Sequence, residues 1–175
     1  MPCVVWFPAE PGADGVVRLR DTPRLTVQDD AGGRAVADVL AASRVEVELS
    51  DDFLSVAWRK LCANALAGMM VLAGRRAGMF RRDDIAALAI AYLDEIAAVG
   101  RAEGADLSPS LGREILGRLQ KAPEDLGSSI LFDHDAGVPT EWRIRNEVIV
   151  LRGRRHGIPT PISDVLVPLL AAASA

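Results

Sequence analysis

The sequence is poor in residues that carry metal or thiol chemistry. Its 175 residues include two cysteines and two histidines, and aromatic residues make up 5%. Neither Cys3 nor Cys62 belongs to a Cys-x-x-Cys pair, so we expect no metal site built on them. The first eight residues lack the basic segment of a signal peptide, and two cysteines fit a reducing compartment. We therefore expect a cytoplasmic protein.

An excess of one charge and a long apolar run are also missing. With 20 basic and 24 acidic side chains the formal net charge is −4, which gives no electrostatic reason to bind nucleic acid. The apolar stretch at 165–173 is interrupted by Pro168 and is far shorter than the ~20 residues that span a bilayer. We expect neither nucleic acid nor a membrane as a partner.

The third absence concerns nucleotides. No Gly-x-Gly-x-x-Gly occurs in the chain. That loop forms the tight turn and the helix N-terminus that bind the pyrophosphate of a dinucleotide. No residue is therefore assigned to dinucleotide phosphates. Hydride transfer by this chain alone is not expected, because that reaction needs an aligned nicotinamide.

The first fifty residues predict strands with one helix. Alternation of apolar and polar residues is typical of half-buried strands. Asp21-Thr22-Pro23 lies between two alternating stretches, which predicts a hairpin. The expected elements are a strand at 3–7, hairpin strands at 16–20 and 24–28, a helix at 33–43 and a strand at 45–49. Together they look like the last part of a doubly wound sheet.

From residue 51 onward the apolar spacing becomes helical. Ser50 or Asp51 can cap the first helix, and Gly74 can end it. We therefore predict two domains, a β/α remnant at 1–50 and a mainly α domain at 51–175. The expected helices lie at 51–72, 83–104, 109–121, 128–136 and 140–156, and from 161 to the C-terminus.

Lys60 and Asn64 are the first candidates for chemistry. They are four residues apart, so on a helix they share one face. An ammonium can protonate a carbonyl oxygen and stabilise the charge that develops there. The amide of Asn64 can donate to and accept from substrate oxygens. The alternatives are a surface lysine whose stem covers apolar neighbours, and an ordinary polar contact at Asn64.

Two further candidates lie where helices are expected to begin. Of Ser128 and Ser129, one hydroxyl can cap the helix, and the other can bind a carboxylate beside free backbone N–H groups. Glu141 lies in the first turn of the next helix, where a carboxylate is favoured for structural reasons too. A cation, an amide, a hydroxyl and a carboxylate together suit a small keto acid.

These motifs resemble those of one enzyme family. Residues 58–64 (Trp-Arg-Lys-Leu-Cys-Ala-Asn) resemble the W-x-K-L-x-x-N segment of ketopantoate reductases, or 2-dehydropantoate 2-reductases. Residues 128–133 and 137–141 resemble the motifs that follow, and 153–161 resembles the G-R-x-H-G-I-x-T-P ending. Residues 12–17 look like a stretch near the end of the family's nucleotide domain.

The resemblance implies NADPH-dependent reduction of a 2-keto acid to a 2-hydroxy acid, as in pantothenate biosynthesis. It implies that Lys60 is the general acid, that Asn64 and Glu141 hold substrate hydroxyls, and that Ser129 binds the carboxylate. It also implies a homodimer and a helical domain like the C-terminal one of 6-phosphogluconate dehydrogenase, preceded by a truncated Rossmann segment. The chain is then a substrate-binding half, inactive without its nucleotide half. The other class is a non-catalytic helical dimerisation or interaction module.

The sequence departs from the family pattern at four places. Gly68 and Gly78 stand where asparagines are expected, Trp142-Arg143 stands where Ile-Asp is usual, and Asn146-Glu147 stands where Asn-Gly is usual. Gly68 lies one turn after Asn64, where a missing side chain leaves space or admits another segment. The sequence therefore leaves the identity of the keto acid open.

Overall fold

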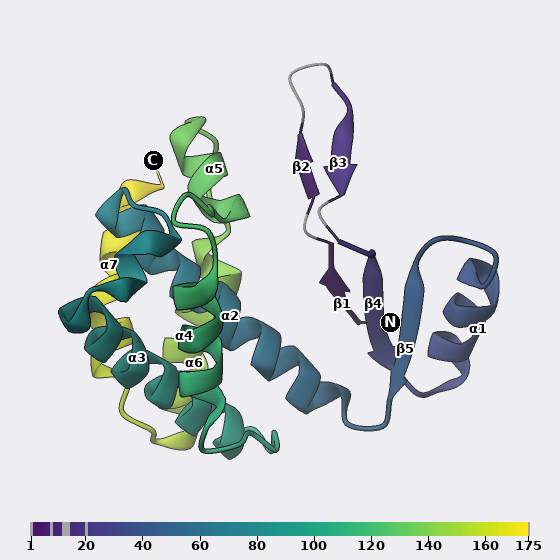
Figure 1. Cartoon of the computed structure of the whole chain (residues 1–175). Helices are drawn as coiled ribbons and strands as arrows, with labels where there is room; N and C mark the ends of the chain where they lie inside the picture. Colours follow the sequence, from purple (N-terminus) through teal and green to yellow (C-terminus); the bar gives the residue numbers. More distant parts are fainter. Residues whose placement is uncertain (1, 8, 12–14, 20, 175) are drawn as a thin grey trace. The chain divides into compact units, whose positions relative to one another are not determined.

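The structure is a computed structural model that describes residues 2–7, 9–11, 15–19 and 21–174. The chain is mostly helical with a small sheet, as the sequence predicted (Figure 1). It divides into two compact units, Met1–Ala57 and Trp58–Ala175. Each unit is described by itself.

The first unit is built on a sheet with the strand order β1-β4-β5 (Figure 1). β1 (Cys3–Trp6) pairs antiparallel with β4 (Arg24–Gln28), and β4 pairs parallel with β5 (Glu46–Ser50). α1 (Ala31–Leu40) connects the two parallel strands. It begins at Asp30, whose carboxylate accepts the N–H of Gly33 at 2.8 Å.

The predicted hairpin is wrong in its strand partners. β3 (Val17–Leu19) pairs antiparallel with β2 (Ala9–Pro11) and not with β4. A residue before proline favours extended backbone, so Asp21-Thr22-Pro23 is no tight turn. The Pro23 carbonyl instead accepts the N–H of Glu46 at 2.9 Å and extends the β4–β5 ladder. Of the family-like stretch at 12–17, residues 12–14 lie outside the described residues.

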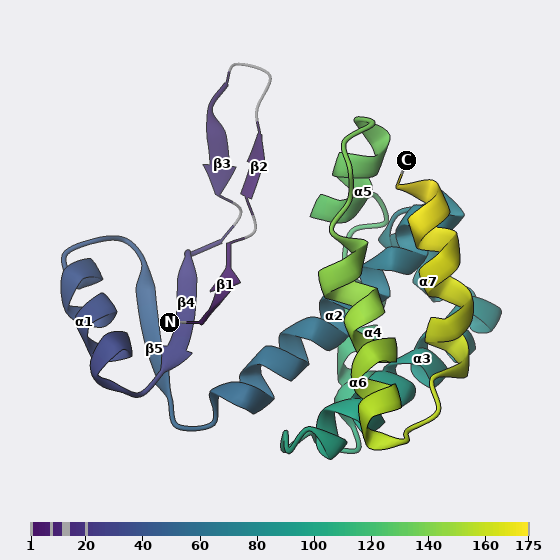
Figure 2. The same ribbon diagram turned by 180° about the vertical axis from the view of Figure 1, so that it is seen from behind.

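The second unit is a cluster of helices. Figures 1 and 2 show α3, α4, α6 and α7 gathered around the second half of α2, and α5 near the C-terminal end of α7. The elements are α2 (Phe53–Ala73), the 3₁₀ turn η1 (Ala77–Arg81), α3 (Asp83–Ala102), α4 (Leu111–Lys121), α5 (Ser129–Asp135), the π-helical segment η2 (Arg143–Glu147), α6 (Val148–His156) and α7 (Pro161–Ala173).

α2 forms the centre of this core. Cys62, Leu66 and Met70 on its inner face are fully or almost fully buried. Within the described residues it is the one helix long and apolar enough to cross a bilayer by length and composition. Half of its most apolar stretch is buried inside the protein, which is typical of a core helix.

Three helices end at glycines, among them α2 at Gly74 as predicted, but the cap that begins α2 differs from the prediction. Gly74, Gly137 and Gly157 have positive φ angles of 57°, 68° and 66° and end α2, α5 and α6. The cap of α2 is Asp52, which accepts the N–H of Ser55 at 3.2 Å, and not Ser50 or Asp51.

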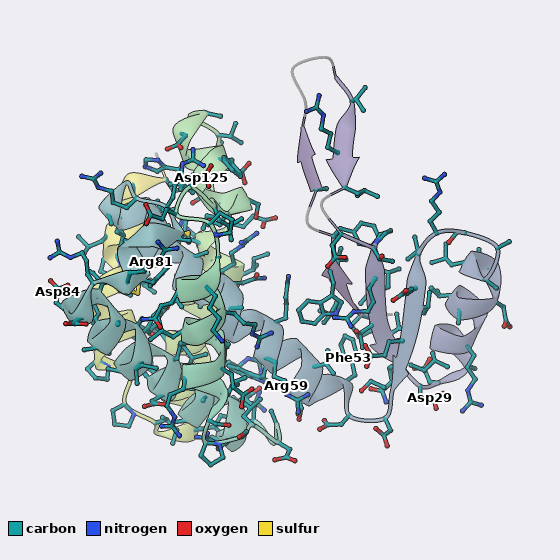
Figure 3. The ribbon with its side chains drawn as sticks, viewed as in Figure 1. Asp29, Phe53, Arg59, Arg81, Asp84 and Asp125 are labelled. Atoms are coloured by element: carbon teal, nitrogen blue, oxygen red, sulfur yellow. The ribbon has the colours of Figure 1, made fainter. Side chains whose placement is uncertain are left out.

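Hydrogen bonds from residues far away in the sequence cap one further helix and link η1 to α4. The Glu95 carboxylate of α3 accepts the N–H groups of Ile162 and Ser163 at 2.8 and 2.9 Å and so caps α7. Arg81 joins η1 to the end of α4, where it donates to the carbonyls of Gln120 and Ala122 at 3.0 and 2.9 Å (Figure 3). These partners are far away in sequence, so local patterns do not show them.

One buried amide joins three elements of the helical unit. Asn146 is fully buried, and its Nδ2 donates to the Ala65 carbonyl of α2 at 2.9 Å and to the Tyr92 hydroxyl of α3 at 3.0 Å. A Cβ atom at Gly68 would lie 3.0 Å from the same Nδ2. The missing side chain at Gly68 therefore admits the Asn146 amide to α2.

Asn146→Ala should lower the free energy of unfolding by about 2 kcal/mol, because it removes two buried hydrogen bonds and leaves a small void. Urea unfolding measures this. The control is Asn64→Ala, which removes a half-buried amide without a hydrogen bond in the described part of the chain, and which should change stability by no more than ~0.5 kcal/mol. Equal losses in the two variants would contradict the anchoring role of Asn146.

Candidate active site

α2 presents the first two candidates as predicted. Lys60 and Asn64 lie one turn apart on this helix, and both are half-buried. Cys62, between them in sequence, faces the core, and burial raises the pKa of its thiol to about 12. The thiol is therefore neutral and takes no part in chemistry at this face.

Ser129 and Glu141 meet at a residue that the sequence did not single out. Arg145 Nη2 donates to Glu141 Oε2 at 2.7 Å and to Ser129 Oγ at 3.1 Å, and its Nε reaches the same glutamate oxygen at 3.3 Å. The Arg145 side chain is 13% exposed, whereas that of Glu141 is 55% exposed. One shielded guanidinium thus brings together two of the predicted site residues.

Lys60 belongs to the same electrostatic group. Burial lowers the pKa of Lys60, and the positive charge of Arg145 lowers it further. The two cations are therefore close enough to repel each other. This environment makes the Lys60 ammonium a stronger acid than an exposed lysine.

Two neighbouring residues of the π-helical segment η2 reach different partners. Arg145 contacts Ser129 and Glu141, whereas Asn146 points into the core and bonds to Ala65. Because Ala65 follows Asn64 directly, this bond fixes η2 against the turn of α2 that carries the candidate amide. A π-helical turn is uncommon and is often found at functional sites.

One sequence signal could have identified Arg145. It lies four residues after Glu141, a spacing at which an acid and a base pair on a helix. Its contact with Ser129 spans 16 residues and depends on the fold, so sequence spacing does not reveal it.

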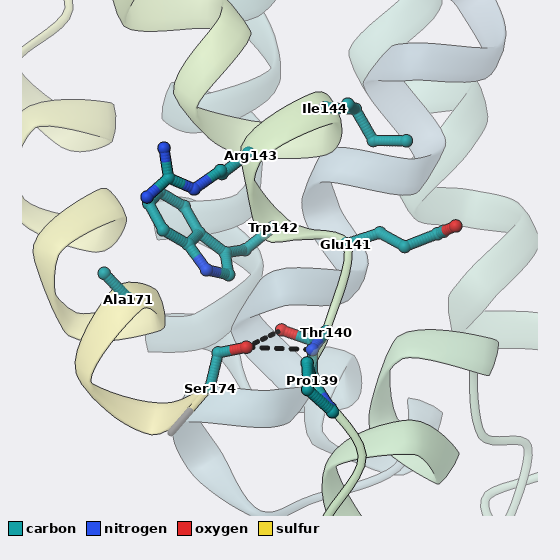
Figure 4. Close-up of a pocket in the computed structure, with 8 residues that line it drawn as sticks. All are labelled: Pro139, Thr140, Glu141, Trp142, Arg143, Ile144, Ala171 and Ser174. Atoms are coloured by element: carbon teal, nitrogen blue, oxygen red, sulfur yellow. Dashed lines mark hydrogen bonds between the residues drawn. The ribbon is translucent and has the colours of Figure 1, made fainter.

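An open pocket of about 520 Å³ lies beside this group (Figure 4). The N–H and the hydroxyl of Thr140 bond to Ser174 Oγ at 2.8 and 2.9 Å, so Thr140 joins α7 and does not cap the predicted helix. In Figure 4 Glu141 extends away from Trp142 and Arg143. The charged partner of Glu141 is Arg145, so we place the candidate site beside Arg145 and not in this pocket. The pocket is lined by Pro139, Thr140, Glu141, Trp142, Arg143, Ile144, Ala171 and Ser174.

The remaining polar candidates have structural surroundings. Ser128 begins α5, but its hydroxyl is buried and makes no cap hydrogen bond. His156 Nε2 lies 2.5 Å from Glu103 Oε1, and Arg152 Nη1 lies 3.2 Å from the other Glu103 oxygen, which ties α6 to the end of α3. Among the described residues no group of His, Cys, Asp and Glu side chains could hold a metal ion.

Comparison with known proteins identifies the class of this fold and site. The family model described as "Ketopantoate reductase PanE/ApbA C terminal" matches residues 52–174. The chain therefore belongs to the ketopantoate reductase family, as its motifs predicted. The 2-dehydropantoate 2-reductases of Mycobacterium tuberculosis and Caulobacter vibrioides are 50% and 36% identical to it over 174 residues. These matches cover 99% of this chain but 59% and 60% of the two relatives.

Solved structures agree with this assignment. A dimeric ketopantoate reductase from Staphylococcus aureus matches 98% of this chain and 61% of its own, with a TM-score of 0.90 and 25% identity. A PanE/ApbA family ketopantoate reductase from Ralstonia eutropha matches 98% of this chain and 58% of its own, with a TM-score of 0.87 and 29% identity. A D-mandelate dehydrogenase in complex with NADH shares the fold, with a TM-score of 0.84 and 22% identity.

The depressed pKa of Lys60 predicts a pH dependence of stability. In the folded state Lys60 loses its proton below the ordinary value of 10.5, so between the two values the unfolded chain binds more protons. The stability of wild type relative to Lys60→Met should therefore rise with pH across this window, because the opposite effect of other groups such as the Cys62 thiol is common to both proteins. Urea unfolding from pH 7 to 10.5 measures the difference between the two proteins.

The control for this experiment is Lys121→Met, at the exposed end of α4, which removes the other lysine of the chain. Its stability relative to wild type should change much less with pH than that of Lys60→Met. A difference between Lys60→Met and wild type that does not vary with pH would contradict the assigned environment of Lys60.

Proposed function

We propose that this chain is the substrate-binding half of a ketopantoate reductase-like enzyme, which reduces a 2-keto acid to a 2-hydroxy acid with NADPH. The observation that carries the proposal is the Arg145 guanidinium. It bonds to Ser129 and Glu141, and its charge acts on Lys60. Residues from α2, α5 and the segment before η2 thus share one electrostatic group, and membership of the family supports the reaction class.

Lys60 is the proton donor in this proposal. As C2 of the keto acid accepts a hydride, its carbonyl oxygen becomes an alkoxide, and Lys60 Nζ gives that oxygen a proton. The lowered pKa of Lys60 favours this transfer, and the ammonium stabilises the developing negative charge before it. Water then returns a proton to the amine.

Ser129, Asn64 and Glu141 hold the substrate. Ser129 binds the carboxylate, and Asn64 and Glu141 bind hydroxyl groups. The Asn64 amide has no hydrogen-bond partner among the described residues, and the bonds of Glu141 there use only Oε2. Both side chains therefore keep hydrogen-bonding capacity for a ligand.

When bound, NADPH supplies the hydride. The sequence has no Gly-x-Gly-x-x-Gly for its pyrophosphate, so the residues present do not form its phosphate site and we assign none to it. The proposal therefore includes a separate nucleotide-binding half, a 6-phosphogluconate dehydrogenase-type domain at 51–175 and a truncated Rossmann segment at 1–50. It also includes a cytoplasmic homodimer, as the S. aureus neighbour is described as dimeric.

Calorimetry on this chain tests the proposal. It should bind 2-dehydropantoate but not NADPH. Asn64→Ala and Glu141→Gln should each weaken keto acid binding by about 5- to 10-fold, the usual effect of one lost hydrogen bond. The control Arg143→Gln changes an arginine that is 73% exposed and pairs with Glu147, and it should bind like wild type.

Two results would count against the proposal. Tight NADPH binding by this chain alone would contradict the separate nucleotide half. Failure to bind any 2-keto acid, together with self-association that rises with concentration, would favour the non-catalytic interaction module instead.

A further inference from the structure

One edge of the Arg145 guanidinium makes no hydrogen bond to the described residues. Arginine carries five N–H donors, and the bonds of Arg145 within the described residues use Nε and Nη2. Nη1 has no hydrogen-bond partner there. The side chain as a whole is 13% exposed, but Nη1 is not among its buried atoms, so this edge can be reached from solvent. The open edge is therefore available to an acceptor from a ligand.

Ser129 adds a second donor beside this edge. Its hydroxyl accepts from Arg145 Nη2 at 3.1 Å, which leaves its own proton free to donate. A carboxylate beside the guanidinium can thus accept from Nη1 with one oxygen and from Ser129 with the other. Glu141 holds the opposite edge of the guanidinium through Nε and Nη2, and so fixes its orientation.

We propose that Arg145, together with Ser129, binds the substrate carboxylate and selects 2-keto acids that carry a single carboxylate. This inference rests on the proposed function and adds a residue and a substrate class to it. In it, Glu141 has two tasks: Oε2 orients Arg145, and Oε1 accepts from the substrate.

The charges of the site give the selectivity. Glu141 already pairs with Arg145, and in this inference it also accepts from a hydroxyl of the substrate. A second carboxylate in place of that hydroxyl would meet the like charge of Glu141 and be repelled.

If the Glu141–Arg145 ion pair had only a structural role, its exposure and its contacts would be different. An acid and a base four apart on a helix surface usually contribute little to stability and stay exposed to water. Arg145 is instead shielded and reaches Ser129 on another helix, and its charge acts on Lys60 of α2. The next residue, Asn146, is anchored to Ala65, which holds this arrangement in place.

Calorimetry on the 175-residue chain with 2-dehydropantoate and its uncharged methyl ester tests the inference. Arg145→Gln should weaken binding of the anion by about 10- to 100-fold and binding of the ester much less, because the attraction between two opposite charges is lost only for the anion. Arg145→Lys keeps the charge but loses the planar fork, and it should lie between wild type and Arg145→Gln. Arg143→Gln should match wild type for both ligands.

The outcomes separate this inference from the proposed function. If wild type binds the keto acid and Arg145→Gln binds it equally well, or loses anion and ester alike, the role of Arg145 is overturned and the proposed function stands. If wild type binds no keto acid, both fall. If Arg145→Gln does not fold, Arg145→Lys provides the same anion-to-ester comparison.

A dicarboxylate tests the selectivity. 2-Oxoglutarate should bind wild type at least 10-fold more weakly than its monomethyl ester at C5, which has the same skeleton and a single carboxylate. Equal binding would overturn the restriction to a single carboxylate.

Discussion

The site depends on one hydrogen bond in the core, from Asn146 Nδ2 to the Ala65 carbonyl at 2.9 Å. Ala65 follows the candidate amide Asn64 on α2, and Asn146 follows Arg145 on η2. This bond therefore connects the helix that carries the proposed acid to the segment that carries the charged partners. A Cβ atom at Gly68 would lie 3.0 Å from this amide, closer than ordinary contacts, so the glycine at this departure from the family pattern leaves room for the bond.

Arg145, the neighbour of Asn146, carries the charge that acts on the other candidate residues. A shielded cation both stabilises nearby anions and lowers the pKa of a neighbouring ammonium. Here one guanidinium does both, because it bonds to Glu141 and acts on Lys60. The same charge that would attract a carboxylate makes Lys60 a better proton donor. In the proposed site, substrate binding and the acid strength of Lys60 are therefore coupled through a single side chain.

The sequence predicted those features that depend on local spacing. The shared face of Lys60 and Asn64 follows from their spacing of four, and the predicted helix at 83–104 matches α3 (Asp83–Ala102) closely. Prediction from the sequence failed where the partner is remote. Alternation of apolar and polar residues does not say which strand pairs with which, and so the predicted hairpin was wrong. The place of Arg145 in the site is also remote information, since its contact with Ser129 spans 16 residues of sequence.

The most direct test of this account is the pKa of Lys60 itself. The chain has two lysines, so protein labelled with ¹³C only in lysine gives a simple NMR titration. The pKa of Lys60 should rise toward its ordinary value of 10.5 in Arg145→Gln, because a nearby positive charge is lost, and it should stay unchanged in Arg143→Gln. A Lys60 pKa that is the same in wild type and Arg145→Gln would contradict the shared electrostatic group.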